Sequence, residues 1–260
     1  KVTLIFNGEI YNYKDLKKIL NQYFNFKTEC DTEVIIAAYT RWGIDCLKYL
    51  QGMFSIAIWD LEKKKLFIAR DRLGIKPLYY LKNQKSFFFS SEIKGILNCS
   101  NINRKLNKQG ILDYFSYRYV LGDQTFYKDI KSMLPGTFLE IDDNLKIKKT
   151  RYWELPIIKN KKDPGEKVVL NKLEEILYKT VESHMMSDVP IGAYLSGGLD
   201  SSLLVAIMSK LSKHPIHTYS IGFDKSGYNE SKYANIVSKL YNTNHKELVI
   251  SVNDYFNLIN

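Results

Sequence analysis

The run Ser196-Gly197-Gly198-Leu199-Asp200-Ser201-Ser202 has the residue types that bind the pyrophosphate of a nucleotide. It follows an apolar segment, 191–195, and precedes a helical pattern, so it stands where a strand passes into a helix. Glycines let the backbone approach an anion, and the amides at the start of a helix face that anion. The serines can donate hydroxyl hydrogen bonds, and Asp200 can hold a magnesium ion against the phosphates. This chemistry predicts a loop that binds ATP.

A simpler explanation of the same loop is structural. Gly197 and Gly198 could form only a tight turn, and Asp200 could be the N-cap of the following helix. The complete run is more specific than two glycines followed by an aspartate, and it differs from the GxxxxGK[ST] phosphate loop. We therefore favour the phosphate-binding interpretation.

The second group of candidate residues is Asn7-Gly8-Glu9-Ile10-Tyr11-Asn12, directly after a strand predicted at Val2–Phe6. A tight polar turn at the strand end would explain this group without any function. As a site, an amide side chain beside a glycine N–H can build an oxyanion hole, and a neighbouring carboxylate can bind an amino group. The residues alone leave both interpretations open.

Apolar periodicity predicts the elements that carry these residues in the first half of the chain. Short strands are separated by helices, and both alternate sets of residues in 54–59 are apolar or small, as in a strand covered on two faces. The apolar faces of two predicted helices consist of Val34, Ile35, Ala38, Tyr39 and Trp42, and of Ile111, Leu112, Phe115 and Tyr119. We expect a sheet-rich α+β domain over residues 1–158.

A linker is predicted at 159–165, where a lysine-rich polar run contains Pro164 and Gly165. Beyond it, helices predicted at 166–185, 201–211 and 230–240 alternate with strands predicted at 191–195, 216–221 and 246–250. This alternation predicts crossover connections and a parallel, doubly wound sheet. We expect a second domain over residues 166–260.

Composition limits the classes of function. The net charge is +10, but the lysines are spread along the chain and arginine is scarce, so we predict no nucleic-acid partner. Apolar runs are too short to span a membrane and the start lacks a signal-peptide pattern, so we expect a cytoplasmic protein without membrane association. The spacing of Cys30, Cys46 and Cys99 and of the four histidines predicts reduced thiols and no structural zinc.

The Ser196–Ser202 run at its strand-to-helix junction resembles the signature of the ATP pyrophosphatase family. Members of that family adenylate a carboxylate or carbonyl oxygen and release pyrophosphate. The resemblance implies that Leu195 and Ile221, at the ends of two strands, line the adenine pocket, and that Asp200 holds magnesium. The full set of ATP-binding residues that it implies is Leu195, Ser196, Gly197, Gly198, Asp200, Ser201 and Ile221.

Further segments carry a second resemblance: Cys30-Asp31-Thr32-Glu33-Val34-Ile35, Gly52-Met53-Phe54, residues 69–80 and Ser90-Ser91-Glu92. Together with Asn7–Asn12 they resemble the class II glutamine amidotransferase domain of glutamine-hydrolysing asparagine synthetases, which precedes an ATP pyrophosphatase domain. The match runs from Val2 to about residue 250. It implies an N-terminal nucleophile hydrolase-like glutaminase domain, with stacked sheets flanked by helices, before the doubly wound domain.

By this resemblance, Asn7 and Gly8 form the oxyanion hole for the side-chain carbonyl of glutamine, and Glu9 and Asp31 bind its α-amino group. Asp31 also stands where it could be the N-cap of a helix. The Arg70-Asp71-Arg72 run is predicted to be a structural ion-pair corner.

The chain departs from the family's pattern at both ends. The family's nucleophile is an N-terminal cysteine whose own α-amine acts as the base, whereas this chain begins with Lys1. An upstream arginine that binds the glutamine carboxylate and a downstream acidic motif and lysine are also absent from it. We expect both domains to be incomplete, and the chain to be a fragment that is inactive by itself.

The leading hypothesis for the parent protein is the ATP-dependent conversion of aspartate and glutamine to asparagine and glutamate, with release of AMP and pyrophosphate. Its implied substrates are glutamine, aspartate and ATP, its implied cofactor is magnesium, and a homodimer of the full-length protein stays open. One alternative is a related amidotransferase or a β-lactam synthetase-like ligase with another acceptor. A tRNA-modifying enzyme and a non-catalytic nucleotide-binding fragment are the alternatives from other classes.

Overall fold

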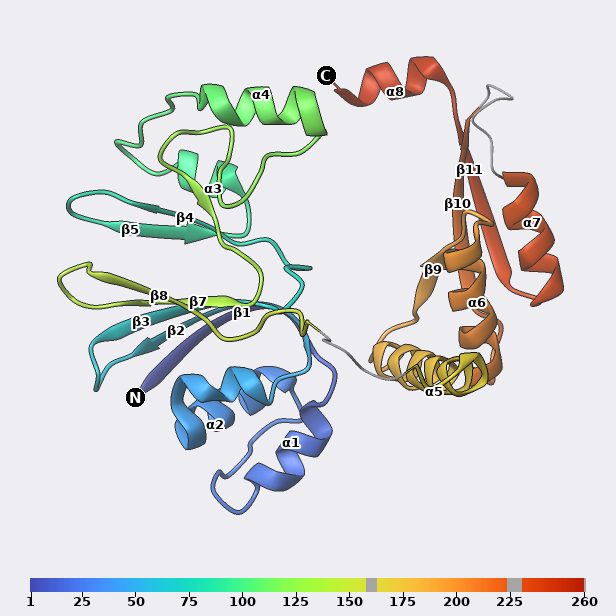
Figure 1. Cartoon of the computed structure of the whole chain (residues 1–260), viewed down its shortest axis with the longest axis horizontal. Helices are drawn as coiled ribbons and strands as arrows, with labels where there is room; N and C mark the ends of the chain where they lie inside the picture. The colour runs from blue at the N-terminus through green and yellow to red at the C-terminus, as the bar shows by residue number, and fades with distance from the viewer. Residues whose placement is uncertain (158–162, 224–230, 260) are drawn as a thin grey trace. The chain divides into compact units, whose positions relative to one another are not determined.

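The computed structural model covers the whole chain and describes residues 1–157, 163–223 and 231–259 (Figure 1). The chain divides into two compact units, Lys1–Lys159 and Asn160–Asn260. The predicted linker at 159–165 falls partly on 158–162, which lies outside the described residues. Residues 163–165 have no regular structure, and the next helix begins at Glu166.

Two antiparallel sheets form the framework of the first unit as far as the structure describes it. The larger sheet has five strands in the order β1-β2-β3-β7-β8, and the smaller has three in the order β5-β4-β6. The larger sheet consists of β1 (Val2–Ile10), β2 (Gly52–Asp60), β3 (Lys65–Arg70), β7 (Thr137–Ile141) and β8 (Ile147–Arg151). The smaller consists of β4 (Tyr79–Lys82), β5 (Phe87–Ser90) and β6 (Lys131–Ser132).

The two sheets are stacked, with helices outside each of them (Figure 1). Against the outer face of the larger sheet pack α1 (Tyr13–Leu20), α2 (Asp31–Trp42) and the 3-10 helix η1 (Gly43–Lys48). Against the smaller sheet packs α3 (Ile93–Leu97), and α4 (Lys108–Tyr117) follows it in the chain. The predicted stacked sheets flanked by helices are therefore confirmed.

The amino acids of β2 explain why this strand is covered on both faces. Phe54, Ile56 and Ile58 pack among the residues of α1 and α2. Ala57 points the other way and packs with Ile68 and residues between the two sheets. Because successive side chains of a strand point to opposite faces, a strand whose two alternate sets of residues are both apolar or small needs cover on both sides. The prediction made from 54–59 is confirmed.

Two expectations for the first unit are wrong. Strand β1 does not end at Phe6, because residues Asn7 to Ile10 continue to pair with β2, and the chain turns only at Tyr11 and Asn12. In α4, Leu112 is 60% and Phe115 is 81% exposed, whereas the buried residues are Gly110 and Asp113. A Cβ at Gly110 would lie 2.6 Å from the carbonyl oxygen of Thr125, so the packed face of α4 is one that needs a glycine.

In the second unit, three parallel strands lie in the order β11-β10-β9, and helices connect them. Val205 of one helix and Ala234 of the next both pack with Leu195, so these two helices share one face of the sheet. In chain order the elements are α5 (Glu166–His184), β9 (Gly192–Tyr194), α6 (Leu199–Leu211), β10 (His217–Phe223), α7 (Ser231–Leu240), β11 (Asn244–Ile250) and α8 (Val252–Ile259). The predicted parallel sheet with crossover helices is confirmed.

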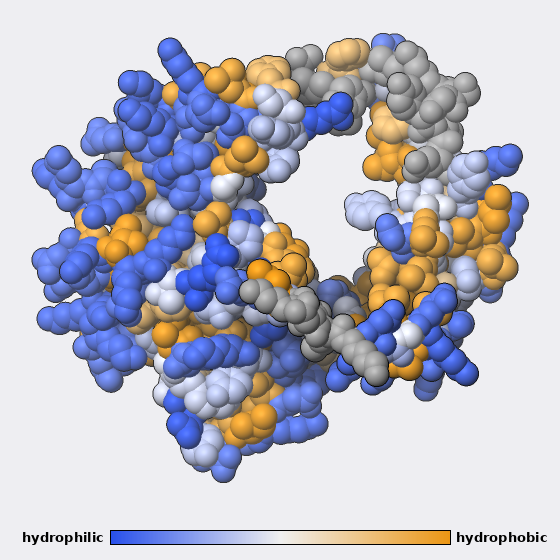
Figure 2. Space-filling view, in the orientation of Figure 1, coloured by the Kyte–Doolittle hydropathy of each residue, from blue (hydrophilic) through white to orange (hydrophobic). Residues whose placement is uncertain are grey.

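Apolar side chains also reach the surface of the second unit (Figure 2). Examples are Ile176 of α5, Leu204 of α6 and Leu240 of α7, whose exposed fractions are 51%, 45% and 71%. None of the helices in the described part of the chain has the length and the apolar character needed to cross a membrane.

Candidate functional site

The Ser196 loop joins the end of β9 to the start of α6. Its backbone is tied to the neighbouring strand, because the N–H of Leu195 donates to the carbonyl oxygen of Tyr219 over 2.8 Å. The hydroxyl oxygens of Ser196 and Ser201 lie 3.0 Å apart, and the N–H of Gly198 donates to Ser196 Oγ over 3.3 Å. The two serine hydroxyls thus face each other across the loop at the beginning of α6.

The two glycines of the loop have different roles. Gly197 has a φ of 80°, and a Cβ at this position would lie 2.5 Å from the backbone nitrogen of Ala234 in α7. Gly198 has a φ of −71°, and a Cβ there would meet only Ser196 Oγ at 3.3 Å. Gly197 is therefore required by the close approach of α7, whereas Gly198 is exposed and presents open backbone.

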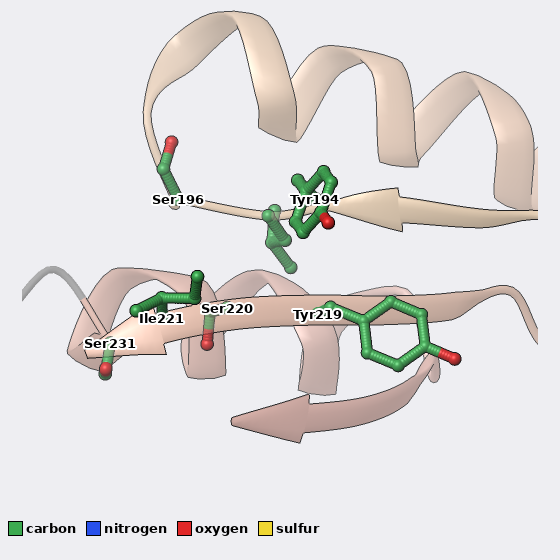
Figure 3. Close-up of a pocket in the computed structure, with 7 residues that line it drawn as sticks. Tyr194, Ser196, Tyr219, Ser220, Ile221 and Ser231 are labelled. Carbon is green, nitrogen blue, oxygen red and sulfur yellow. The ribbon is translucent and has the colours of Figure 1, made fainter. Parts of the chain in front are cut away.

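A pocket of about 160 Å³ opens at the carboxyl ends of β9 and β10 (Figure 3). Three residues predicted to bind ATP, Leu195, Ser196 and Ile221, meet in its wall. Ligands of open parallel sheets bind at this end of the strands. The volume is below the range of about 300–1,000 Å³ that is typical of ligand pockets, so the pocket can enclose a part of a nucleotide. The other lining residues are Tyr194, Tyr219, Ser220 and Ser231.

Asp200 is not among the residues that line this pocket; it lies on the first turn of α6, and its side chain is exposed. The N-cap residue of α6 is Gly198, so the interpretation of Asp200 as the N-cap is wrong. Magnesium is commonly bound by one or two carboxylates, with water and substrate phosphates as the other ligands. Within 1–157, 163–223 and 231–259, no group of three or more His, Cys, Asp or Glu side chains could hold a metal. A single exposed carboxylate beside the glycine loop could hold a magnesium ion only together with ligands from water or from a bound phosphate.

The second candidate site lies at the end of β1, which is an edge strand of the larger sheet. Phe54 of β2 makes two hydrogen bonds to Asp71. Its N–H donates to the Asp71 carboxylate over 3.2 Å, and its carbonyl oxygen accepts the N–H of Asp71 over 2.9 Å. The N–H and carbonyl of Phe54 therefore point away from β1. In an antiparallel pair, the residue opposite then also directs its N–H and carbonyl outward, so the N–H of Gly8 points away from β2. Asp31 binds this same edge, because Asp31 Oδ2 accepts the N–H of Ile10 over 3.0 Å.

Glycine is needed at position 8 for the approach of the two strands. A Cβ at Gly8 would collide with the carbonyl of Met53 and lie 2.7 Å from the Cα of Phe54. The predicted oxyanion-hole glycine therefore also has a packing role. Asp31 is the first residue of α2 and its N-cap is Cys30, so the interpretation of Asp31 as an N-cap is wrong.

Asn7 and Glu9 lie on the face of β1 opposite to Gly8. The Asn7 amide donates to Ser91 Oγ over 3.1 Å. Burial is the largest cause that raises the pKa of Glu9, the charge of Asp31 raises it further, and Lys76 opposes this shift. Glu9 and Asp31 are thus close enough to repel each other, and a cationic group between them would relieve that repulsion.

The loop after β3 holds Lys76 near Glu9. The Asp71 carboxylate, which is 1% exposed, accepts backbone N–H groups over 2.9–3.2 Å. Arg70 donates to backbone carbonyl oxygens on both sides of this loop over 2.6–2.7 Å. The predicted ion-pair corner is wrong, because these charged groups bind the backbone. The donors to Asp71 are Phe54, Leu73, Ile75 and Lys76, and the acceptors of Arg70 are Gly74, Lys76 and Met133.

Comparison with known proteins assigns each unit to a family. The family model described as a glutamine amidotransferase domain matches residues 1–153, and the one described as asparagine synthase matches residues 172–260. A protein of Methanocaldococcus jannaschii, provisionally named glutamine-hydrolysing asparagine synthetase 2, is 41% identical over 266 residues, which cover 99% of this chain and 50% of that protein. Glutamine-hydrolysing asparagine synthetase 3 of Bacillus subtilis is 35% identical, over 97% of this chain and 43% of that protein.

The chain belongs to the family of glutamine-hydrolysing asparagine synthetases. It spans half or less of the length of these two relatives. Among solved structures, glutamine phosphoribosylpyrophosphate amidotransferase from Bacillus subtilis, complexed with ADP and GMP, aligns with 95% of this chain and 45% of that chain, at 16% identity and a TM-score of 0.40.

Some residues of the pocket in this member of the asparagine synthetase family were not predicted. Tyr194 precedes the predicted residue Leu195. Tyr219 and Ser220 are the two residues before the predicted residue Ile221. Their place at the strand ends could therefore have indicated them. Ser231 enters from α7, and no pattern in the sequence marks it. Tertiary structure alone brings α7 to the pocket.

Proposed function

We propose that this chain takes part in glutamine-dependent asparagine synthesis, the first unit acting on glutamine and the second on ATP and aspartate. The parent reaction converts aspartate and glutamine to asparagine and glutamate and releases AMP and pyrophosphate. The observation that carries the proposal is the pocket at the ends of β9 and β10, where Leu195, Ser196 and Ile221 meet beside the glycine loop. The order of the two matched domain families supports it.

In the second unit, the adenine would lie against the apolar wall formed by Leu195 and Ile221. The phosphates would follow the loop from Ser196, where the hydroxyl of Ser201 and the N–H of Gly198, which donates to Ser196 Oγ in this structure, would turn to oxygen anions. The start of α6 adds the positive end of its dipole. A bound magnesium ion would neutralise the negative charge of the departing pyrophosphate, and Asp200 is the residue that would hold it.

In the first unit, the side-chain carbonyl of glutamine would accept hydrogen bonds at the open edge of β1. The N–H of Gly8 points to that edge, and Asn7 supplies an amide that Ser91 already orients. Glu9 and Asp31 would bind the α-ammonium group, whose charge compensates their mutual repulsion. These two pairs of residues lie next to each other along β1 and at the start of α2, so one amino acid can reach both.

Calorimetric titration of the 260-residue chain with MgATP tests the assignment of the second unit. We expect saturable binding with one site, and a large loss of affinity in Asp200→Ala when magnesium is present. Asp188→Ala is the matched control, because Asp188 is also exposed but lies before β9. Binding that is equally strong in Asp200→Ala, or the absence of binding by the unchanged chain, would contradict the proposal.

A further inference from the structure

One hydroxyl-bearing residue of the pocket, Ser220, is held from β11, a strand that does not line the pocket. His245 of β11 lies beside Thr218 and Ser220 of β10, which are 0% and 7% exposed. One ring nitrogen, Nδ1, is 2.9 Å from Thr218 Oγ1, and the other, Nε2, is 3.1 Å from Ser220 Oγ. Thr218 Oγ1 also lies 2.7 Å from Thr243 Oγ1. Both nitrogens of this imidazole are therefore engaged by buried hydroxyl groups.

The direction of the two serine side chains shows which part of the pocket these contacts hold. In Figure 3, Ser220 and Ser231 both point away from Tyr194, whereas Ile221 is turned toward the open space. The backbone and Cβ of the serines therefore form the wall, while the hydroxyl of Ser220 is anchored behind it by His245. Without this anchor, the end of β10 would lose a side-chain contact to β11.

We propose that His245 is a positioning residue of the pocket, which holds Ser220 so that the wall fits the nucleotide. This inference rests on the proposed ATP site. His245 acts through Ser220 and does not touch the ligand. The two hydroxyls can each donate or accept, so a neutral imidazole satisfies both of its nitrogens with either tautomer.

Substitutions of His245 separate the pocket contact from the contact in the core. In His245→Gln, the terminal amide can reach Ser220 in place of Nε2, and the contact to Thr218 is lost. In His245→Asn, the shorter amide can replace Nδ1 at Thr218 but cannot reach Ser220. We expect the dissociation constant for MgATP to rise about 3- to 10-fold in His245→Asn, which corresponds to the loss of one hydrogen bond, and to stay near that of the unchanged chain in His245→Gln.

A cycle with Ser220→Ala tests whether His245 acts through this serine. We expect His245→Asn to have no further effect on the dissociation constant in the Ser220→Ala chain, since the anchor is already lost. His214→Ala is the control, because His214 is exposed in the turn before β10.

Several results would overturn the inference. Equal dissociation constants in His245→Asn and His245→Gln would assign the imidazole a role in the core alone. If His245→Asn raises the dissociation constant as much in the Ser220→Ala chain as in the unchanged chain, His245 does not act through Ser220. If the unchanged chain does not bind MgATP, the proposed function fails, and the positioning role is then decided by methyl NMR without ligand. In that case a shifted Ile221 methyl signal in His245→Asn and an unshifted one in His245→Gln support the role, and any other pattern refutes it.

Discussion

Ile10 and Asp31 are 21 positions apart, and the N–H of Ile10 donates to Asp31 Oδ2 over 3.0 Å. This bond attaches the first residue of α2 to the open edge of β1. It places the carboxylate of Asp31 on the side to which Gly8 directs its N–H, and within electrostatic reach of Glu9. A single backbone contact thus brings together the residues proposed to bind both ends of glutamine.

The titration of Glu9 should report its two charged neighbours. We expect a pKa above the ordinary value of 4.5, lowered in Asp31→Asn and raised further in Lys76→Met, because these variants remove a repelling and an attracting charge. A raised pKa means that the folded protein binds this proton more tightly than the unfolded chain. The contribution of Glu9 to stability is therefore present at low pH and is lost as the pH rises through its pKa.

A carboxyl-detected NMR titration of the chain measures this pKa. The amide oxygen introduced by Asp31→Asn can still accept the N–H of Ile10, so this variant changes the charge while it keeps the contact. Shifts of equal sign in the two variants would contradict the proposed arrangement.

Gly197→Ala should destabilise the second unit. The positive φ and the collision with α7 together should lower the free energy of unfolding by about 3 kcal/mol. Gly198→Ala, with a negative φ and one mild contact, should change it by less than about 1 kcal/mol.

Urea unfolding followed by circular dichroism detects this effect. The three tryptophans, Trp42, Trp59 and Trp153, all lie in the first unit, so their fluorescence is an internal control. We expect it to unfold at the same urea concentration in both glycine variants. Equal stability of the two variants would show that α7 can move away from Gly197 at little cost.

Asp71→Ala should destabilise the first unit by about 4 kcal/mol, because it leaves buried backbone N–H groups without their acceptor. Tryptophan fluorescence in urea measures the change. Asp129→Ala is the control, since Asp129 is an exposed aspartate of the same unit. A loss below about 1 kcal/mol, the size expected of one ordinary hydrogen bond, would mean that the loop relaxes around the missing carboxylate.

The cysteines should differ in their reaction with iodoacetamide. Cys30 is exposed, whereas Cys46 is 0% exposed and burial raises the pKa of its thiol from 9.0 to about 12. At neutral pH this shift alone leaves about 1,000-fold less of the reactive thiolate. Mass spectrometry should find early modification of Cys30, absent in Cys30→Ser, and modification of Cys46 only after unfolding. Rapid modification of Cys46 in the native chain would show that η1 opens readily.

Features that depend on residues close together in the chain could be predicted from the amino-acid sequence alone. The glycines and serines of 196–202, the polar run 7–12 and the alternation of helices with strands are readable because each depends on residues that are neighbours in the chain. The same is true of β2, whose two alternate sets of residues in 54–59 are apolar or small and require cover on both faces. The resemblance implies roles for residues whose types alone left the function open.

Only the tertiary structure decided the contacts between distant segments. Asp71 stands between two arginines in the sequence, which predicts an ion pair. Its carboxylate instead binds backbone N–H groups that only the folded loop brings near. Ser231 reaches the pocket, and His245 reaches Ser220, because parallel strands and their crossover helices meet at one edge of the sheet. Such contacts follow from the packing of whole elements, and no spacing along the chain encodes them.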